Sequence, residues 1–284
     1  MEIKDIAVIG GGTMGNGIAH IFAQYGFNTT LIDTKQEFLD KALNTIKANL
    51  ERQAKKGVIP ADKVAQTLSH IKTTTNIDEA KNAQLVIEAV FEDLSVKKEI
   101  FLKLDKICPA ETILATNTSS LPITQIAALT HRPAKIIGMH FMNPVPMMKL
   151  IELIRGIATS DDTFGIIKNT CLKIEKTPVE VNDYPAFVAN RLLVPMINEA
   201  VYCVMEGVAK PEDIDTVMKL GMNHPMGPLT LADFIGLDVC LAVMEVLYEG
   251  YSDPKYRPCP LLRKMVQAGY LGRKTGRGFY IYEK

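Results

Sequence analysis

The chain has 284 residues, 47% of them hydrophobic and 23% charged, as in an ordinary globular protein. Its 32 basic and 32 acidic residues cancel, so no long-range field favours nucleic acid or an anionic membrane as a partner. The first predicted strand begins almost at the N-terminus, and no apolar run reaches ~18 residues. We therefore expect neither a secretory signal nor a membrane span, and a cytoplasmic protein. The 5 widely spaced cysteines predict reduced thiols, with no disulfide or metal site.

A glycine-rich turn follows the first predicted strand. Apolar residues predict a buried strand at 6–9 and a helix at 13–25. Between them, Gly10 permits a tight turn, Gly12 lets the backbone approach a pyrophosphate, and Gly15 lets the helix pack closely on the strand. The N–H groups of the first helical turn would face the phosphates.

A second predicted strand, at 29–32, ends at Asp33. A carboxylate there can accept hydrogen bonds from a ribose 2′-hydroxyl and would repel the 2′-phosphate of NADP. A lone GxGxxG pattern also occurs in ordinary loops, but here strand, turn, helix, strand and acid follow in the expected order. The sequence thus predicts a dinucleotide site that prefers NAD to NADP, a preference that the nearby Lys35 weakens.

The residues after Asp33 alternate between patterns typical of helices and patterns typical of strands. Helices are predicted at 36–56, 62–68, 95–107, 123–129 and 164–174, and strands at 71–75, 85–90, 113–116, 135–141, 150–154 and 179–181. This alternation predicts a doubly wound, mainly parallel, Rossmann-type sheet. Later residues predict helices only, at 187–205, 211–220, 229–248 and 260–267. We expect an α/β domain over 1–184 and a smaller all-α domain over 185–284.

Polar residues directly follow several of the predicted strands. In doubly wound sheets, ligands bind at the carboxyl ends of the strands, so these residues should converge at one edge. Besides the glycine turn they are Asp33, Glu92, Asn117, Ser119 and His140.

His140 and Glu152 form the candidate catalytic pair. A histidine near a strand end is more often structural than catalytic. Glu152, however, lies in the next predicted strand among apolar residues, where an unpaired carboxylate would be costly to bury. If the two strands are neighbours, Glu152 can hold one imidazole nitrogen while the other faces a substrate. His140 could then take a proton from an alcohol while the cofactor takes the hydride.

Other polar residues have two interpretations. Asn190 lies on the apolar stripe of helix 187–205, where it either satisfies the backbone disturbed by Pro195 or faces a substrate between the domains. Ser119 and Asn117 either cap the helix at 123–129 or, for Ser119, bond a substrate oxygen. No GxSxG, HExxH or GxxxxGK[ST] pattern occurs, which excludes the hydrolase and kinase classes that these motifs mark.

The end of helix 36–56 is basic. Arg52, Lys55 and Lys56 precede Gly57. Cations there complement the helix dipole, and a contact with a ligand phosphate is an equally good interpretation.

Five segments of the sequence form a recognisable set. They are IGGGTMG at 9–15, NTSS at 117–120, GMHFMNP at 138–144 with Glu152 following, FVANR at 187–191 and HPMGP at 224–228. Together they resemble the 3-hydroxyacyl-CoA dehydrogenases, and the resemblance covers essentially the whole chain. The compact length, without a hydratase domain, is most like the bacterial 3-hydroxybutyryl-CoA dehydrogenases.

The resemblance implies a role for each matching residue. His140 would be the catalytic base and Glu152 its partner, and Ser119 and Asn190 would bind the substrate's oxygens. The helical domain would form a homodimer interface. NAD would lie along Gly10, Gly12, Thr13, Met14, Gly15, Asp33, Glu92, Lys97, Asn117 and Asn143, with Asn143 supporting the site. Asn49 and Lys56 would contact coenzyme A, which favours the ligand interpretation of the basic cluster.

The implied reaction is the NAD(H)-linked interconversion of a short-chain (S)-3-hydroxyacyl-CoA, such as (S)-3-hydroxybutyryl-CoA, and the 3-ketoacyl-CoA, such as acetoacetyl-CoA. One alternative is a dehydrogenase of the same family that acts on a free hydroxy acid, as the gulonate dehydrogenases do. Another is a non-catalytic NAD-binding protein. Its expected mark, loss of the His and Glu pair, is absent here.

Overall fold

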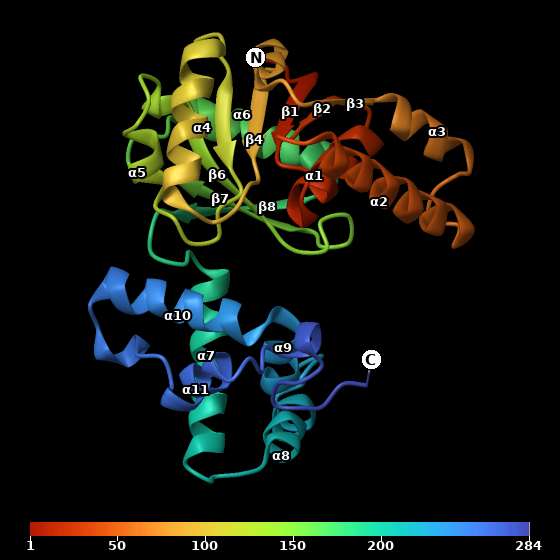
Figure 1. Cartoon of the computed structure of the whole chain (residues 1–284). Coiled ribbons are helices and arrows are strands. Elements are labelled where there is room, and N and C mark those ends of the chain that lie inside the picture. The colour runs from red at the N-terminus through yellow and green to blue at the C-terminus, as the bar shows by residue number, and fades with distance from the viewer. Residues whose placement is uncertain (284) are drawn as a thin grey trace. The chain divides into compact units, whose positions relative to one another are not determined.

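The computed structural model describes residues 1–283, and the chain divides into two compact units, Met1–Asp183 and Tyr184–Lys284. The first unit is an α/β domain built on one sheet, and the second is helical (Figure 1). The predicted fold class, a Rossmann-type domain followed by an all-α part, is confirmed. Within residues 1–283, no helix combines the length and apolar character needed to cross a membrane.

The sheet of the first unit has eight strands in the order β3-β2-β1-β4-β5-β6-β7-β8. Neighbouring strands pair in parallel, except for β6 and β7, which are antiparallel. The carboxyl ends of β1, β2, β4, β5 and β6 therefore share one edge. The strands are β1 (Asp5–Ile9), β2 (Asn28–Ile32), β3 (Ile71–Thr74), β4 (Leu85–Glu88), β5 (Ile113–Thr116), β6 (Ile136–Phe141), β7 (Leu150–Arg155) and β8 (Thr177–Asn182).

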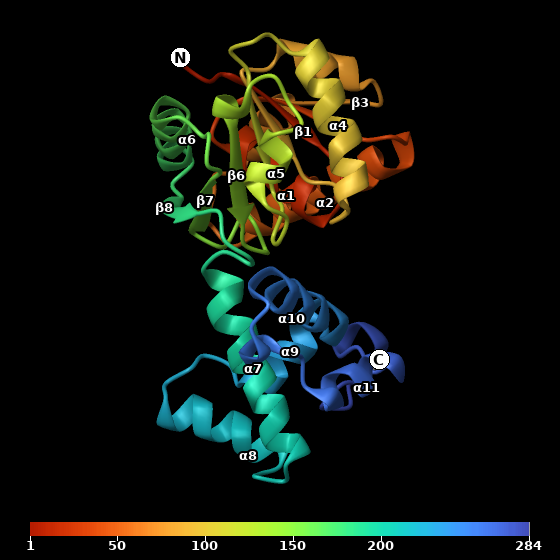
Figure 2. The same ribbon diagram turned by 90° about the vertical axis from the view of Figure 1, so that its left-hand side faces the viewer.

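Helices cover both faces of this sheet. The helices are α1 (Thr13–Gln24), α2 (Gln36–Lys55), α3 (Asp62–Ser69), α4 (Leu94–Ile107), α5 (Ile123–Ala127) and α6 (Asp161–Lys173), with 3-10 turns at Ile77–Asn82 and Pro133–Lys135. Helices α1 and α6 pack on one face, and α4 and α5 on the other (Figures 1 and 2). The predicted boundaries are confirmed to within a few residues.

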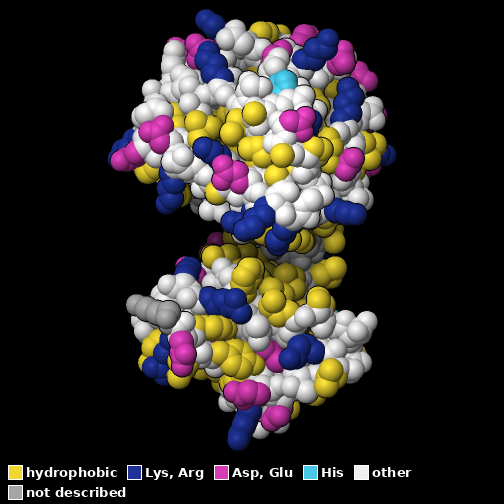
Figure 3. Space-filling model, turned by 90° about the vertical axis from the view of Figure 1, so that its right-hand side faces the viewer, with side chains coloured by type: hydrophobic (Ala, Val, Ile, Leu, Met, Phe, Trp, Pro, Cys, Tyr) yellow, Lys and Arg dark blue, Asp and Glu magenta, His cyan; other side chains and the backbone are white. Residues whose placement is uncertain are grey.

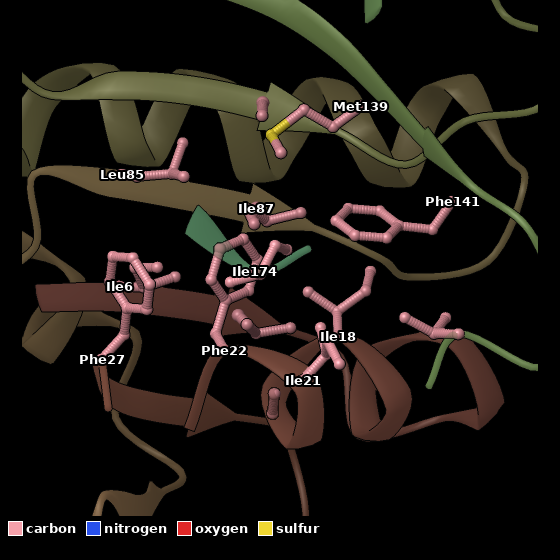
Figure 4. Packing of buried hydrophobic residues seen from close by; sticks show 14 of the residues in the cluster. Ile6, Ile18, Ile21, Phe22, Phe27, Leu85, Ile87, Met139, Phe141 and Ile174 are labelled. Carbon is pink, nitrogen blue, oxygen red and sulfur yellow. The ribbon is translucent and has the colours of Figure 1, made fainter. Parts of the chain in front are cut away.

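The core on the α1 side of the sheet joins β1, β4 and β6 to α1 (Figure 4). The ring of Phe22 forms T-shaped contacts with the rings of Phe27 and Phe141, at centroid distances of 5.5 and 6.3 Å. Phe141, only 2% exposed, is the last residue of β6. Because successive strand residues point to opposite faces, burying Phe141 here directs its neighbour His140 to the other face.

The second unit consists of α7 (Ala189–Met205), α8 (Pro211–Thr216), a π-helical turn (Val217–Gly221), α9 (Pro228–Ile235), α10 (Leu237–Tyr251) and α11 (Pro260–Gln267), with 3-10 turns at Pro254–Tyr256 and Arg273–Thr275. The single helix predicted at 229–248 is wrong. The chain breaks between α9 and α10 at Gly236, whose φ of +107° belongs to neither helix.

Residues 279–282, for which no structure was predicted from the sequence, are held in place by Asp233. This carboxylate, 1% exposed, accepts hydrogen bonds from the N–H groups of Phe279 and Tyr280, each at 3.0 Å, and from the hydroxyl of Tyr282, also at 3.0 Å. The contact is between residues far apart in sequence, so no local pattern indicates it.

His20 is a polar residue inside the first unit. Its Nε2 lies 3.0 Å from Gln24 Oε1, while its Nδ1 has no hydrogen-bond partner among residues 1–283. Burial disfavours the charged imidazole and, with a smaller contribution from Lys176, lowers the pKa of His20 to about 4 despite the bond to Gln24.

We expect His20 to make the fold sensitive to acid. The unfolded chain takes up a proton here below the ordinary pKa of 6.5, whereas the folded chain does so only near 4. The stability that neutral His20 contributes is therefore complete above pH 6.5 and falls as the pH falls toward 4, by about 2 kcal/mol at pH 5. Urea unfolding at pH 7 and pH 5 should show this loss, and His20→Leu should reduce it. An equal loss in both proteins would contradict the prediction.

Candidate active site

The glycine turn after β1 has no space for side chains at two positions. At Gly10, with a φ of +104°, a Cβ would lie 2.7 Å from the backbone oxygen of Ala89. At Gly15 a Cβ would lie 1.7 Å from the backbone oxygen of Gly10, so the start of α1 rests directly on the turn. At Gly12 a Cβ would meet nothing within 4 Å. Two glycines are therefore required by packing, and the third leaves the backbone open to an approaching group.

The start of α1 can bind an anion. Gly12 is the N-cap residue and provides no side-chain cap, so the first-turn N–H groups at Thr13 and Met14 have no capping side chain there. Beside the turn, Asp33 Oδ2 accepts the N–H of Gly11 at 2.6 Å, which fixes its carboxylate at the end of β2. An open backbone, exposed helix N–H groups and a carboxylate together fit the pyrophosphate and ribose of a dinucleotide.

Glu92 holds the loop after β5. Its Oε1 accepts the N–H groups of Ser119 at 2.9 Å and Ser120 at 3.1 Å, and also the hydroxyl of Thr118. Partial burial alone would raise the pKa of Glu92, but the charge of Lys97 and these donors outweigh it and lower the pKa. The carboxylate is thus charged and fixes the backbone of Ser119.

Neither Asn117 nor Ser119 caps α5. The first N–H groups of α5, at Ile123 and Thr124, bond instead to the carboxylate of Asp183 at 3.0 and 2.7 Å. The capping interpretation is therefore wrong. Asn117 Oδ1 accepts the N–H of Phe141 at 3.0 Å, which ties the end of β5 to the end of β6.

His140 and Glu152 lie directly opposite each other on β6 and β7, so the condition that the two strands are neighbours is met. His140 Nδ1 lies 2.8 Å from Glu152 Oε2, and the two residues are 8% and 2% exposed. With its proton on Nδ1, His140 donates to the carboxylate, and Nε2 then carries the lone pair. Such an arrangement can orient a histidine to act as a general base.

The remaining predicted residues are more dispersed. Asn143 is exposed in the loop after β6. Asn49 is half-buried on α2, and Lys56 is exposed as its C-cap residue. Asn190 is half-buried at the start of α7, in the second unit. Lys97 is 1% exposed, with Nζ 2.7 Å from Glu88 Oε1 and 3.4 Å from Glu92 Oε2.

Glu88 was not among the site residues predicted from the sequence. This residue is fully buried at the end of β4, where Oε1 accepts Lys97 Nζ and Oε2 accepts the hydroxyl of Thr116, both at 2.7 Å. The signal was available, since a carboxylate inside the apolar run 85–90 needs partners.

Among residues 1–283, no three His, Cys, Asp or Glu side chains cluster so as to hold a metal ion.

Comparisons with known proteins cover the whole chain. Residues 5–184 match the family model of the NAD binding domain of 3-hydroxyacyl-CoA dehydrogenase, and residues 187–282 match that of its C-terminal domain. The chain is 58% identical to the probable 3-hydroxybutyryl-CoA dehydrogenase of Bacillus subtilis, over 100% of this chain and 99% of the relative. With the 3-hydroxybutyryl-CoA dehydrogenase of Clostridioides difficile, the identity is 53% over 98% of this chain and 99% of the relative. The crystal structure of (S)-3-hydroxybutyryl-CoA dehydrogenase from Ralstonia eutropha matches with a TM-score of 0.98 at 49% identity, over 100% of both chains.

Gly12 and Gly15 should respond differently to a single methyl group. Because a Cβ at Gly12 meets no protein atom, Gly12→Ala should unfold like the unchanged protein but bind NADH roughly tenfold more weakly, a loss of ~1.4 kcal/mol. Gly15→Ala forces the turn and α1 apart and should destabilise the fold by ~3 kcal/mol or more. Thermal unfolding and a fluorescence titration with NADH measure both effects. Similar behaviour of the two variants would show that this account of the turn is mistaken.

Proposed function

Since this chain belongs to the 3-hydroxyacyl-CoA dehydrogenase family, we propose that it interconverts (S)-3-hydroxybutyryl-CoA and acetoacetyl-CoA with NAD(H). The observation that carries the proposal is the contact between His140 and Glu152 at the ligand-binding edge of the sheet. The full-length similarity to proteins named 3-hydroxybutyryl-CoA dehydrogenase supports this substrate.

His140 moves the proton in this reaction. In the direction of oxidation, Nε2 accepts the hydroxyl proton of the 3-hydroxyacyl group and becomes part of an imidazolium. In the reverse direction, the same nitrogen returns the proton to the oxygen of the 3-keto group. The nicotinamide, when bound, supplies or accepts the hydride at the carbon.

Glu152 keeps His140 in the required state. Its carboxylate accepts a hydrogen bond from the N–H of Nδ1, which selects the tautomer with the lone pair on Nε2, and its charge stabilises the imidazolium that forms. Glu152 is only 2% exposed, so little water screens this interaction.

Substrate and cofactor contacts complete the proposed site. Ser119 and Asn190 bind the substrate's oxygens, Asn143 supports the site, and Asn49 and Lys56 contact coenzyme A. The cofactor lies along Gly10, Gly12, Thr13, Met14, Gly15, Asp33, Glu92, Lys97 and Asn117. Asp33 favours NAD because its charge repels a 2′-phosphate. Lys35, which could offset this, lies 3.6 Å from the carboxylate of Glu37.

We propose the helical domain, predicted from the sequence at 185–284, for substrate binding and homodimer formation, in a cytoplasmic enzyme. Large apolar side chains on its surface support an interface. Leu192 is 70% exposed, Leu220 82% and Phe234 54%, and hydrophobic atoms cover much of its visible face (Figure 3).

The proposed reaction can be tested directly with purified protein. Adding acetoacetyl-CoA and NADH should consume NADH, and NADPH should support a slower rate because of Asp33. Free acetoacetate is the matched control, since it lacks the coenzyme A portion. Equal rates with free acetoacetate would indicate a hydroxy-acid dehydrogenase instead, and no reaction with either cofactor would exclude the proposal.

Replacing either member of the pair should slow catalysis without loss of the cofactor. His140→Gln removes the base and should lower kcat roughly 100- to 10,000-fold, with the Kd for NADH unchanged. Glu152→Gln keeps the shape but loses the charge, and should lower kcat by a smaller factor. His70→Gln, outside the site, serves as the matched control. Unchanged turnover in His140→Gln would remove this residue from the mechanism.

A further inference from the structure

Glu88 is the most completely buried charged group at the ligand edge of the sheet. It lies at the carboxyl end of β4, paired in register with Ile9 of β1 and Thr116 of β5. Besides Lys97 and the hydroxyl of Thr116, its carboxylate accepts the N–H of Val90 at 2.7 Å. A fully buried carboxylate with three short donors stays in one position.

Lys97 connects Glu88 to Glu92. Its ammonium, also shielded from water, lies 2.7 Å from Glu88 and 3.4 Å from Glu92. The three charges therefore alternate from the buried strand end to the partly exposed Glu92. Removing one partner of such a buried pair leaves the other uncompensated, so the position of Lys97 depends on Glu88.

Glu92 passes this constraint to the loop after β5. A single carboxylate oxygen accepts the N–H groups of Ser119 and Ser120 and the hydroxyls of Thr118 and Ser120. The loop after β5 is thus fixed by Glu92, which lies in the segment that follows β4. Glu92 is held in turn by the buried ammonium of Lys97.

We propose that Glu88 is a positioning residue that, through Lys97 and Glu92, fixes the loop 118–120 and thereby the orientation of Ser119. The part that concerns substrate rests on the proposed function of Ser119, whereas the part that concerns the loop does not. In this arrangement Lys97 acts on the loop through Glu92, in addition to its proposed place beside the cofactor, since its ammonium lies near two carboxylates and is 1% exposed.

Amide hydrogen exchange of the full-length protein tests the proposal independently of activity. Glu88→Gln should speed exchange at residues 118–121 by on the order of tenfold, while the second unit keeps its protection. Glu92→Gln should do the same, and the double variant should add little, because both changes break one chain of contacts. Glu99→Gln, on the exposed face of α4, is the matched control and should change nothing.

Kinetics then separate positioning from mere destabilisation. Glu88→Gln should lower kcat on the order of 10- to 100-fold through misplacement of Ser119, with the Kd for NADH within about threefold of the original. If Glu88→Gln does not fold, the double variant Glu88→Leu with Lys97→Met replaces the ion pair by apolar groups and should still show the faster loop exchange.

Unchanged exchange at 118–121 in these variants, a uniform loss of protection throughout the chain, or fully additive effects would each overturn the proposal. A weaker Kd for NADH with kcat unchanged would also overturn it, because the network would then position the cofactor through Glu92 and Lys97 and not Ser119. Failure of the proposed function is distinguishable, because an inactive wild-type protein would still give the exchange result.

Discussion

The contact between His140 and Glu152 depends on one antiparallel pairing in an otherwise parallel sheet. Strand register there is set by hydrophobic burial. Phe141 faces the core on the α1 side, and Ile151 and Leu153 are fully buried on β7. A slip of one residue would move all of these side chains to the opposite faces and would separate the imidazole from the carboxylate. The polar contact is therefore a consequence of apolar packing, which also supplies the low dielectric that strengthens it.

The two buried carboxylates at this edge each have a polar partner. Glu88 forms an ion pair with Lys97, and Glu152 accepts a hydrogen bond from His140, with at most a tenth of each side chain exposed. Apolar residues of similar size could stabilise such positions equally well or better. The presence of the two carboxylates is therefore better explained by what they orient. Glu88 orients a loop, and Glu152 orients an imidazole.

The structure could be predicted from the sequence where it depends on residues close together in the chain. Strand and helix periodicity predicts the sheet, and the spacing of Gly10, Gly12 and Gly15 predicts a turn that packing requires at two of its three glycines. The sequence was insufficient where distant residues meet. The cap of α5 comes from Asp183, which is 59 residues from Thr124, whereas a local pattern favours the nearby Asn117 and Ser119. Gly236 was visible in the sequence, but a single glycine does not by itself show that a helix ends.

Within the first unit, the loop that carries Ser119 and the strand that carries His140 are coupled through Asn117. Asn117 begins the loop that carries Ser119. Its N–H donates to the backbone oxygen of Glu88 at 2.7 Å, and its Oδ1 accepts the N–H of Phe141, the residue after His140. A shift of the loop would thus be transmitted to β6, and a shift of β6 to the loop. Because catalysis requires the base and the groups that hold the substrate's oxygens to keep a fixed separation, this coupling accounts for an amide at position 117 better than helix capping does.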